Sequence, residues 1–494
     1  MYITRAMCGF RTYVHATRPR RGWAPLARGM VAAMVFVAHG IQGRADLPVP
    51  IQAFYWAAAI VLVVSFVGLA IGWRRPLLAA LLERTARPWN PGRFARTALV
   101  VARAVSVALL LLVIATALFG STDLNSNFAP IWVFVVWWIG IALVAATVGD
   151  WWRAVHPIAA IARLLRIPEH STGRLPAAAG VWPAFIGLLA FTWLELVYPT
   201  AANVRQLGWL VLAWAIAALL ATWRFGIRDT LDRIEPFAAY TRVLGHIGVL
   251  GERRADADSE TDPSLERRPP VLGLLRLRDV PGLAPFIGLL IGSVSFDGLS
   301  RTIWWKQRVA SATVRLVERG VEPIHAQRIL GTLGLVMMVT LAISAFLLFA
   351  RLAAIVGRLP RRTRFGSVAA AFAPSLAPIA FAYVIAHYFS FFWFQSQQVV
   401  RLASDPFGRG WNLFGTDSFQ VDYTTLSANA IWIVQVVAIV VGHVLALVLA
   451  HDRALEIEAD TPGARGVRSQ WPMLALMVLY TIGGLYFLSE GLNS

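Results

Sequence analysis

Long apolar runs alternate with short polar connections along most of the 494-residue chain. About ten of these runs approach or reach the roughly 20 residues that an α-helix needs to cross the hydrocarbon of a bilayer. Trp or Tyr stands at many of their ends, where interfacial anchors are expected. The pattern predicts an all-α fold, a polytopic transmembrane helix bundle. The expected spans are Phe54–Trp73, Thr97–Gly120, Ile131–Gly149, Gly180–Tyr198, Leu207–Trp223, Gly282–Phe296, Ile329–Val356, Ala370–Phe394, Ala428–Ala450 and Trp471–Leu488.

The first 38 residues follow a different pattern. A basic stretch without acidic residues ends at Arg28, and the short apolar core Met30–Ala38 follows it. A basic region followed by a core too short to span is typical of a secretory signal peptide. We therefore predict that residues 1–38 are a signal peptide, or a signal anchor if uncleaved, and that residues 39–494 form the transmembrane domain. Cleavage after Ala38 would leave His39 at the mature N-terminus. Phe36 would then occupy the third position before the cleaved bond, where signal peptides usually have a small residue.

Positive charge is concentrated in the connections. The chain is 57% hydrophobic and 15% charged, and its net charge of +18 comes almost entirely from arginine. Arg-rich connections alternate with Arg-poor ones, which indicates a plasma-membrane protein with its long Arg-rich loops in the cytoplasm. This topology explains the basic composition without nucleic acid as a partner. Ser300–Arg328 is the exception, because it is basic on the predicted outer side, and an amphipathic surface helix would account for it.

Two further features limit the possibilities. Residues 251–270 are rich in charge and lack aromatic side chains, so we expect a flexible cytoplasmic linker there. The single cysteine, Cys8, excludes an internal disulfide and a thiolate metal cluster.

Ionisable side chains inside apolar spans are costly, so each is a candidate functional residue. The predicted topology puts Glu195, Asp297 and His387 near the outer ends of three different spans. We expect them to converge at the level of the outer headgroups. Other polar residues expected on that face are His39, Asp46, Gln395, Asp405 and Gln435. A second set, Asp150, His443 and Asp452, is expected towards the cytoplasmic side.

These residue types fit two kinds of site. His387 with Glu195 or Asp297 could activate water, directly as a base or through a divalent metal such as zinc or copper. Imidazole suits both metals, and His39 with His387 is the predicted metal-ligand pair. The same groups could instead form an ion relay.

A structural explanation stands beside the functional one for each residue. Glu195 could extend to the interface, and Asp297 before Gly298 could end a helix. Asp452 beside Arg453 is expected to form an ion pair or a helix-end contact. Polar side chains of this kind also hold membrane helices together.

Seven short motifs occur along the chain: His39–Gly40, Gly43–Pro48, Trp193–Tyr198, Ser295–Gly298, Ala386–Ser390, Ala403–Pro406 and Ala450–Ala454. Together they resemble the motifs of a bacterial integral membrane family commonly labelled fenitrothion hydrolase. The resemblance covers nearly the whole chain from His39 onwards, and it implies hydrolysis of an organophosphorus triester. It carries no assigned catalytic residues over to this chain.

Three functions remain open from the sequence. The first is a hydrolase acting on a small lipophilic ester, and the second is a transporter or metal-handling protein. The third is a structural or assembly protein of the bilayer. The sequence contains no Gly-x-Ser-x-Gly, His-Glu-x-x-His or nucleotide-binding fingerprint that would select an enzyme class. Substrate, metal and oligomeric state are not determined by the sequence.

Overall fold

The computed structural model describes residues 51–494 except 171–172, 174, 199–202, 253–264, 278–279, 359–364, 461–465 and 494. These residues are mostly helical, and nine of their helices are long and apolar enough to cross a membrane. The predicted polytopic helical fold is confirmed. The spans are α5 (Arg93–Phe119), α6–η1–α7 (Phe128–Ile131, Trp132–Trp137, Trp138–Val148), α10 (Trp182–Leu196, preceded by η2, Ala177–Ala179), α11 (Val204–Phe225), α14 (Leu283–Arg301), α16 (Pro323–Val356), α17–η5–α18 (Phe365–Phe372, Ala373–Leu376, Ala377–Gln395), α20 (Ala428–Asp460) and α21 (Gly466–Asn493).

The remaining expected span corresponds to α3 (Ile51–Gly72), an apolar helix of 22 residues. Every predicted span therefore has a helix at its position. The predicted signal segment, His39 and Asp46 lie outside the described residues.

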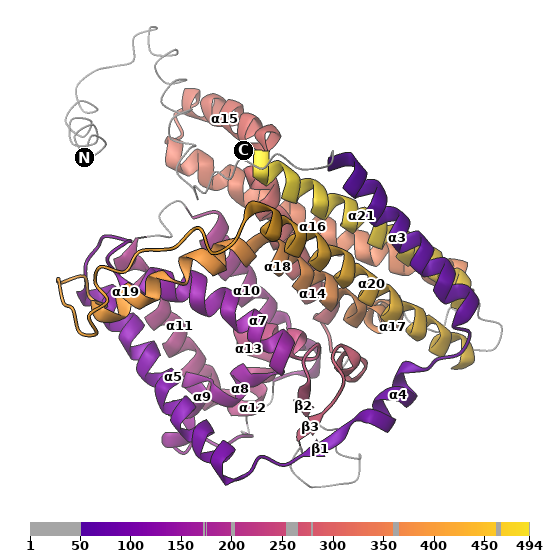
Figure 1. The fold of residues 1–494 in the computed structure, drawn as a ribbon, viewed down its shortest axis with the longest axis horizontal. Coiled ribbons are helices and arrows are strands. Elements are labelled where there is room, and N and C mark those ends of the chain that lie inside the picture. The colour runs from indigo at the N-terminus through magenta and orange to yellow at the C-terminus, as the bar shows by residue number, and fades with distance from the viewer. Residues whose placement is uncertain are drawn as a thin grey trace.

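The helices form two bundles that meet along one junction (Figure 1). The first bundle contains α5, α6–η1–α7, α10 and α11, together with the short helices α8 (Trp151–Val155), α9 (Pro157–Leu164), α12 (Ile227–Asp229), η3 (Thr230–Ile234) and α13 (Pro236–Gly245). The second bundle contains α3, α14, α16, α17, α18, α20 and α21. At the junction α10 packs against α14, while α7 and α13 pack against α18.

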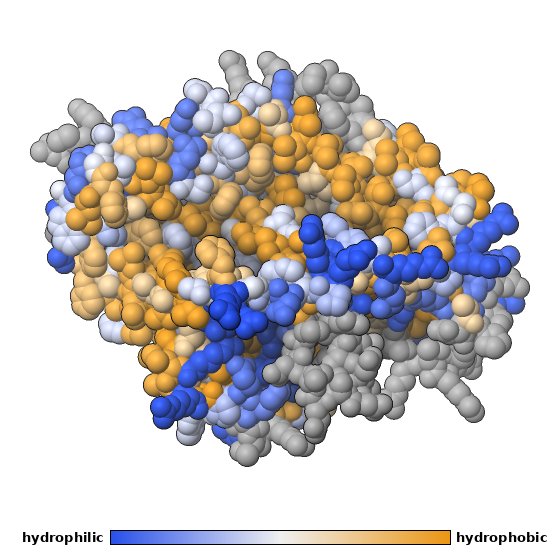
Figure 2. Space-filling model, turned by 60° about the horizontal axis from the view of Figure 1, so that its bottom comes forward, coloured by the Kyte–Doolittle hydropathy of each residue, from blue (hydrophilic) through white to orange (hydrophobic). Residues whose placement is uncertain are grey.

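The outer surface of both bundles is apolar. Only Val113, Thr116 and Ala117 of α5 are buried, whereas side chains such as Val100 and Leu111 are exposed. Figure 2 shows this apolar surface, with hydrophilic side chains gathered in the lower half of the view. Helices satisfy their own backbone hydrogen bonds, so a bilayer can cover such a surface without cost. The protein is a multi-pass membrane protein whose apolar helices lie in the bilayer.

Helix α14 forms the centre of the molecule. Its residues from Phe286 to Leu299 are all buried, because α10, α16, α18 and α21 surround it. A helix that is apolar on all sides can be covered by lipid or by other helices, and α14 is covered by helices. Any polar residue near the end of α14 is therefore placed between the two bundles.

A small antiparallel sheet lies outside the spans. Its order is β1 (Arg87–Trp89), β3 (Leu265–Arg267) and β2 (Leu250–Glu252). Part of the linker expected over 251–270 is therefore paired strand: its first two residues belong to β2, and β3 lies near its other end. Residues 253–264, between the two strands, lie outside the described part. The charges of this segment pair with one another in the folded protein: buried Glu266 pairs with Arg268 at 3.7 Å and with Arg276. These pairs favour a folded strand over the flexible linker that was expected. Charge-rich composition alone does not show that the charges pair with one another.

Four further helices complete the described chain, two of which are the short helices α4 (Leu78–Thr85) and η4 (Leu272–Arg276). Helix α15 (Ile303–Glu318) occupies the basic stretch for which an amphipathic surface helix was expected. It turns Arg308 and Arg315 outwards and Thr313 towards the protein, and it packs against α16. Helix α19 (Gln398–Ser404) follows α18.

Candidate functional site at the junction of the bundles

A buried carboxylate and a guanidinium group form the centre of the candidate site. Asp297 and Arg301 lie one helical turn apart on α14, and this spacing puts both side chains on one face. Arg301 donates from Nη2 and from Nε to the two Asp297 oxygens at 2.8 and 3.3 Å. Asp297 is only 6% exposed. Two-point pairing of this kind offsets much of the cost of burying the Asp297 carboxylate.

Helix α18 brings an imidazole and a phenol to the same place. The His387 ring packs directly on Gly298, where a Cβ would lie 2.8 Å from the ring Cε1. Only glycine leaves room for this contact. The neighbouring Tyr388 is buried and hydrogen-bonds the Asp297 carboxylate.

The first bundle contributes a second carboxylate, that of Glu195. Glu195, on α10, accepts a hydrogen bond from the Trp138 indole of α7. Its carboxylate is close enough to interact electrostatically with Asp297 and Arg301 across the junction. Glu195, Asp297 and His387, which the sequence nominated, therefore come together, and they come from both bundles.

A polar connection continues from this cluster along α13. The Tyr240 ring lies 5.0 Å from the Trp138 ring, and Tyr240 also interacts electrostatically with Glu195. The next residue, Thr241, donates to Asp150 Oδ1 at 3.3 Å. One short helix thus contacts the junction cluster through Tyr240 and a second carboxylate through Thr241.

Asp150 belongs to a charged network beyond the end of α7. Asp232 pairs with Arg153 and, at 3.5 Å, with Arg242, while Arg153 lies 3.8 Å from Glu252. Burial raises the pKa of Asp150 to about 6, although Arg153 and Arg242 act in the opposite direction. Asp150 therefore titrates near neutral pH, unlike an ordinary aspartate.

Helix α13 is itself anchored by a buried carboxylate. Glu235 caps its N-terminus by accepting from the Ala238 backbone N–H, and it also accepts from the Trp214 indole at 3.0 Å. His156 Nε2 lies 3.3 Å from the same carboxylate, and both side chains are almost fully buried. This capping fixes the position of Tyr240 and Thr241 one to two turns further along.

Four nominated residues lie away from the cluster. Gln435 donates to the Ala386 carbonyl at 2.7 Å, and His443 Nδ1 lies 2.7 Å from the Ile439 carbonyl within its own helix. Gln395 pairs with Gln398. Asp405 accepts from the backbone of the turn that follows it.

Asp452 makes a helix-end contact, one of the two structural roles expected for it. Its carboxylate accepts from the Leu77 N–H at 2.7 Å and the Leu78 N–H at 3.2 Å, and so caps α4 (Leu78–Thr85). Arg453 does not pair with it, because Arg453 pairs with Glu456. The preceding His451 bonds the Trp73 carbonyl at 2.8 Å.

Sequence reasoning missed four members of the site. Arg301 stands four residues after Asp297, a spacing that could have suggested the pair, but it was grouped with the basic stretch that follows. Tyr388 directly follows His387. Trp138 and Tyr240 carried no signal, since one aromatic residue among many in apolar sequence does not show which neighbour it will meet.

A metal site is not supported by the described residues, which contain no group of three or more His, Cys, Asp or Glu side chains able to hold a metal ion. The predicted zinc or copper pair combines His387 with His39, and His39 lies outside those residues. The metal prediction therefore stays untested.

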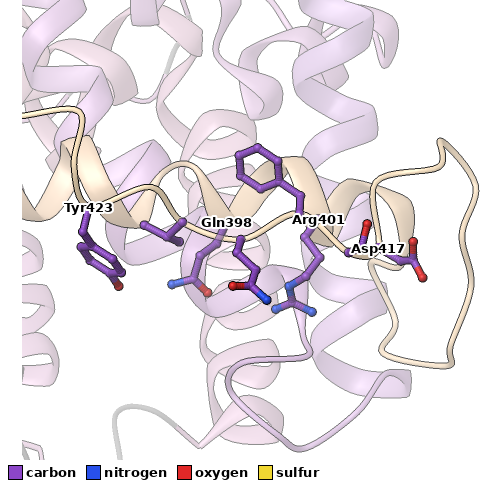
Figure 3. A pocket seen from close by; sticks show the side chains of 8 residues that line it. Gln398, Arg401, Asp417 and Tyr423 are labelled. Carbon is purple, nitrogen blue, oxygen red and sulfur yellow. The ribbon is translucent and has the colours of Figure 1, made fainter.

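A cavity of about 410 Å³ lies elsewhere, between α19 and the loop after it. Figure 3 shows Gln398, Arg401, Asp417 and Tyr423 along its wall. None of the three nominated junction residues lines it.

Comparison with known proteins finds no similar family model, no similar curated protein and no similar solved structure. The resemblance to the fenitrothion hydrolase family stays a prediction.

Proposed function

We propose that this protein moves protons across the membrane along a relay formed by Glu195, Tyr240, Thr241 and Asp150. The observation that carries the proposal is the position of α13: Tyr240 interacts electrostatically with Glu195, and the adjacent Thr241 donates a hydrogen bond to Asp150. Ionisable groups inside a membrane protein are retained mainly where ions or protons pass. Polar groups at both depths suit a pathway better than a surface site.

The chemistry of the four groups is consistent with this role. Asp150, with its pKa near 6, can take up and release a proton under physiological conditions. Burial, and secondarily the charge of Glu195, raises the pKa of Tyr240 well above its usual range, so its hydroxyl stays protonated. Tyr240 can then pass a proton on only as it receives another. Bridging waters would complete any step longer than a hydrogen bond.

The two-bundle architecture gives the relay a means of control. Glu195 and Trp138 belong to the first bundle, whereas Asp297, Arg301, His387 and Tyr388 belong to the second. Rocking of one bundle against the other is a common transport motion. Such a motion would separate Glu195 from the Asp297–Arg301 pair without breaking contacts inside either bundle.

A proton-flux measurement tests the proposal. Purified protein in liposomes that contain a pH-sensitive dye is exposed to a potassium gradient with valinomycin. We expect wild-type protein to acidify the lumen when the imposed potential is negative inside and to alkalinise it when the potential is positive inside. Glu195→Gln should lower the rate at least tenfold, while Glu318→Gln, the same chemical change on the exposed face of α15, should leave it unaltered. Equal rates in both variants, or no wild-type flux, would contradict the relay.

Hydrolysis of an organophosphorus ester is the second candidate, and the family motifs favour it. In that case Glu195 or His387 would activate water beside the Arg301 guanidinium. Turnover of an aryl dialkyl phosphotriester by the same liposomes, lost in His387→Ala, would support it. If neither flux nor turnover occurs, the structural or assembly function is the remaining candidate.

A further inference from the structure

The connection between α3 and α5, together with the first turn of α5, covers residues 73–96 and contains none of the relay residues. We call it the interfacial strap. It crosses the end of the molecule from the second bundle to the first through α4 and β1 (Figure 1). At one end it follows the apolar helix α3, and at the other it leads into α5, which is long and apolar enough to cross a membrane. The strap therefore lies at the level where the bilayer meets water.

Helix α4 has more apolar surface than the protein covers. Leu78 and Leu82, four residues apart, are buried against the protein, with exposures of 5% and 2%. Leu77 and Leu81 form a second stripe of the same spacing, and they are 51% and 45% exposed. A soluble surface helix would place polar residues on this second stripe. The leucines need a second apolar medium, and the adjacent bilayer provides it.

The rest of the strap repeats this combination of exposed apolar and basic groups. Trp89 and Phe94 are 38% and 88% exposed. Six arginines of the strap are exposed, and none of them forms an ion pair within the described part of the chain: Arg74, Arg75, Arg84, Arg87, Arg93 and Arg96. The single acidic residue, Glu83, is paired at 2.8 Å with Arg276, outside the strap.

The strap is held in place before any lipid binds. Asp452 caps α4 through the Leu77 and Leu78 N–H groups, and His451 bonds the Trp73 carbonyl. Strand β1 is paired with β3 along its length. Because the backbone is fixed, lipid binding does not have to order it.

We propose that the interfacial strap binds anionic phospholipid headgroups of the adjacent leaflet. Leu77 and Leu81 would enter the boundary between headgroups and acyl chains, as in interfacial amphipathic helices. The arginines would reach the phosphates, since long basic side chains extend their charge to the headgroups while their stems stay in apolar surroundings. The proposal stands whether or not the protein carries protons.

Lipid binding is measured by native mass spectrometry of the full chain with added phosphatidylglycerol or phosphatidylcholine. We expect wild-type protein to retain phosphatidylglycerol preferentially. The triple variant Arg74→Gln, Arg84→Gln, Arg87→Gln should weaken that binding at least tenfold. A matched triple variant on α15 and the residue that follows it, Arg308→Gln, Arg315→Gln, Arg319→Gln, should bind like wild type. Equal loss in both triples, or no preference in the wild type, overturns the proposal.

The depth of α4 is measured separately with a nitroxide label. Because Cys8 is the only cysteine, Cys8→Ser provides a background in which Leu81→Cys can be labelled alone. In bilayers containing phosphatidylglycerol the label should be relaxed more by oxygen than by a water-soluble nickel chelate. Leu413→Cys, an exposed leucine of the loop after α19, should show the reverse. If both labels behave alike, the strap does not enter the lipid.

Discussion

Buried polar groups in this membrane protein fall into two regions with different kinds of partners. Inside the second bundle, Gln435 bonds a backbone carbonyl and Asp452 bonds two backbone N–H groups. At the junction, Asp297 has Arg301 and Tyr388 as partners and lies near Glu195. Gln435 and Asp452 thus bond fixed backbone groups, whereas the junction brings together ionisable side chains from separate bundles.

This difference distinguishes side chains that stabilise helix packing from side chains that can take part in function. A side chain bonded to the backbone of a neighbouring helix adds stability, and little is gained from moving it. An ionisable side chain whose partners are also ionisable can exchange them when a proton arrives. Of the nominated residues, those at the junction fit the second description.

The largest effect is expected from breaking the junction ion pair. Asp297→Leu leaves Arg301 without its partner carboxylate, which should destabilise the protein by about 3 kcal/mol. The double variant Asp297→Leu, Arg301→Leu should recover most of that stability, since it removes both charges. Thermal unfolding in detergent measures both values. A double variant as unstable as the single one would show that the pair itself is not the source of the loss.

Asp452 should affect stability alone. Asp452→Leu removes the cap of α4 and leaves two backbone N–H groups unsatisfied, at a cost of about 2 kcal/mol. Proton flux per folded molecule should equal that of wild type, because the residue belongs to the backbone-bonded class. A flux loss beyond the loss of folded protein would place Asp452 in the functional class instead.

Asp150 should make stability depend on pH. Its folded pKa of about 6 lies above the ordinary aspartate value, so the ionised form is the disfavoured one in the folded protein. Relative to Asp150→Asn, wild-type stability should therefore rise as pH falls through 6 and level off below about 4, by about 2 to 3 kcal/mol in total. Parallel unfolding curves of the two proteins from pH 8 to pH 4 would contradict this shift.

Gln435 should matter least. Gln435→Met exchanges one hydrogen bond to the Ala386 carbonyl for a flexible apolar side chain of similar length, so the change should stay below about 1 kcal/mol. Flux should be unaffected. Unfolding temperature and flux together check this, and a tenfold flux loss would move Gln435 to the functional class.

The fold was largely predictable from the sequence because apolar length determines membrane spans. Each expected span has its helix, including the short Gly282–Phe296 segment, which extends to Arg301 as α14. Convergence of Glu195, Asp297 and His387 also followed from their shared depth. The depth of a residue in the membrane, however, does not determine towards which neighbouring helix its side chain points. Gln395 and Gln435 have similar predicted depths, yet they point elsewhere.

The short helices were not predictable in the same way. Helix α13 is too short to register as a span, and it is buried only because α7, α10 and α18 surround it. Its role depends on long-range contacts that local periodicity does not encode. The charged strands β2 and β3 were missed for the same reason, since their stability comes from pairing with distant residues.

The π-helical turn η1 has a consequence for how the chain tolerates change in length. Its wider turn accommodates one more residue than an α-helical turn. Trp137, its last residue, and Trp138, the first residue of α7, both contact Phe237 of α13, with ring centroids 4.4 and 6.1 Å apart. Deleting one residue between Trp132 and Trp137 would leave an ordinary helix, but it would rotate α7 by about 100° relative to the preceding loop. Trp138 would then face away from Glu195, so this segment has a fixed residue count even though its composition is generic.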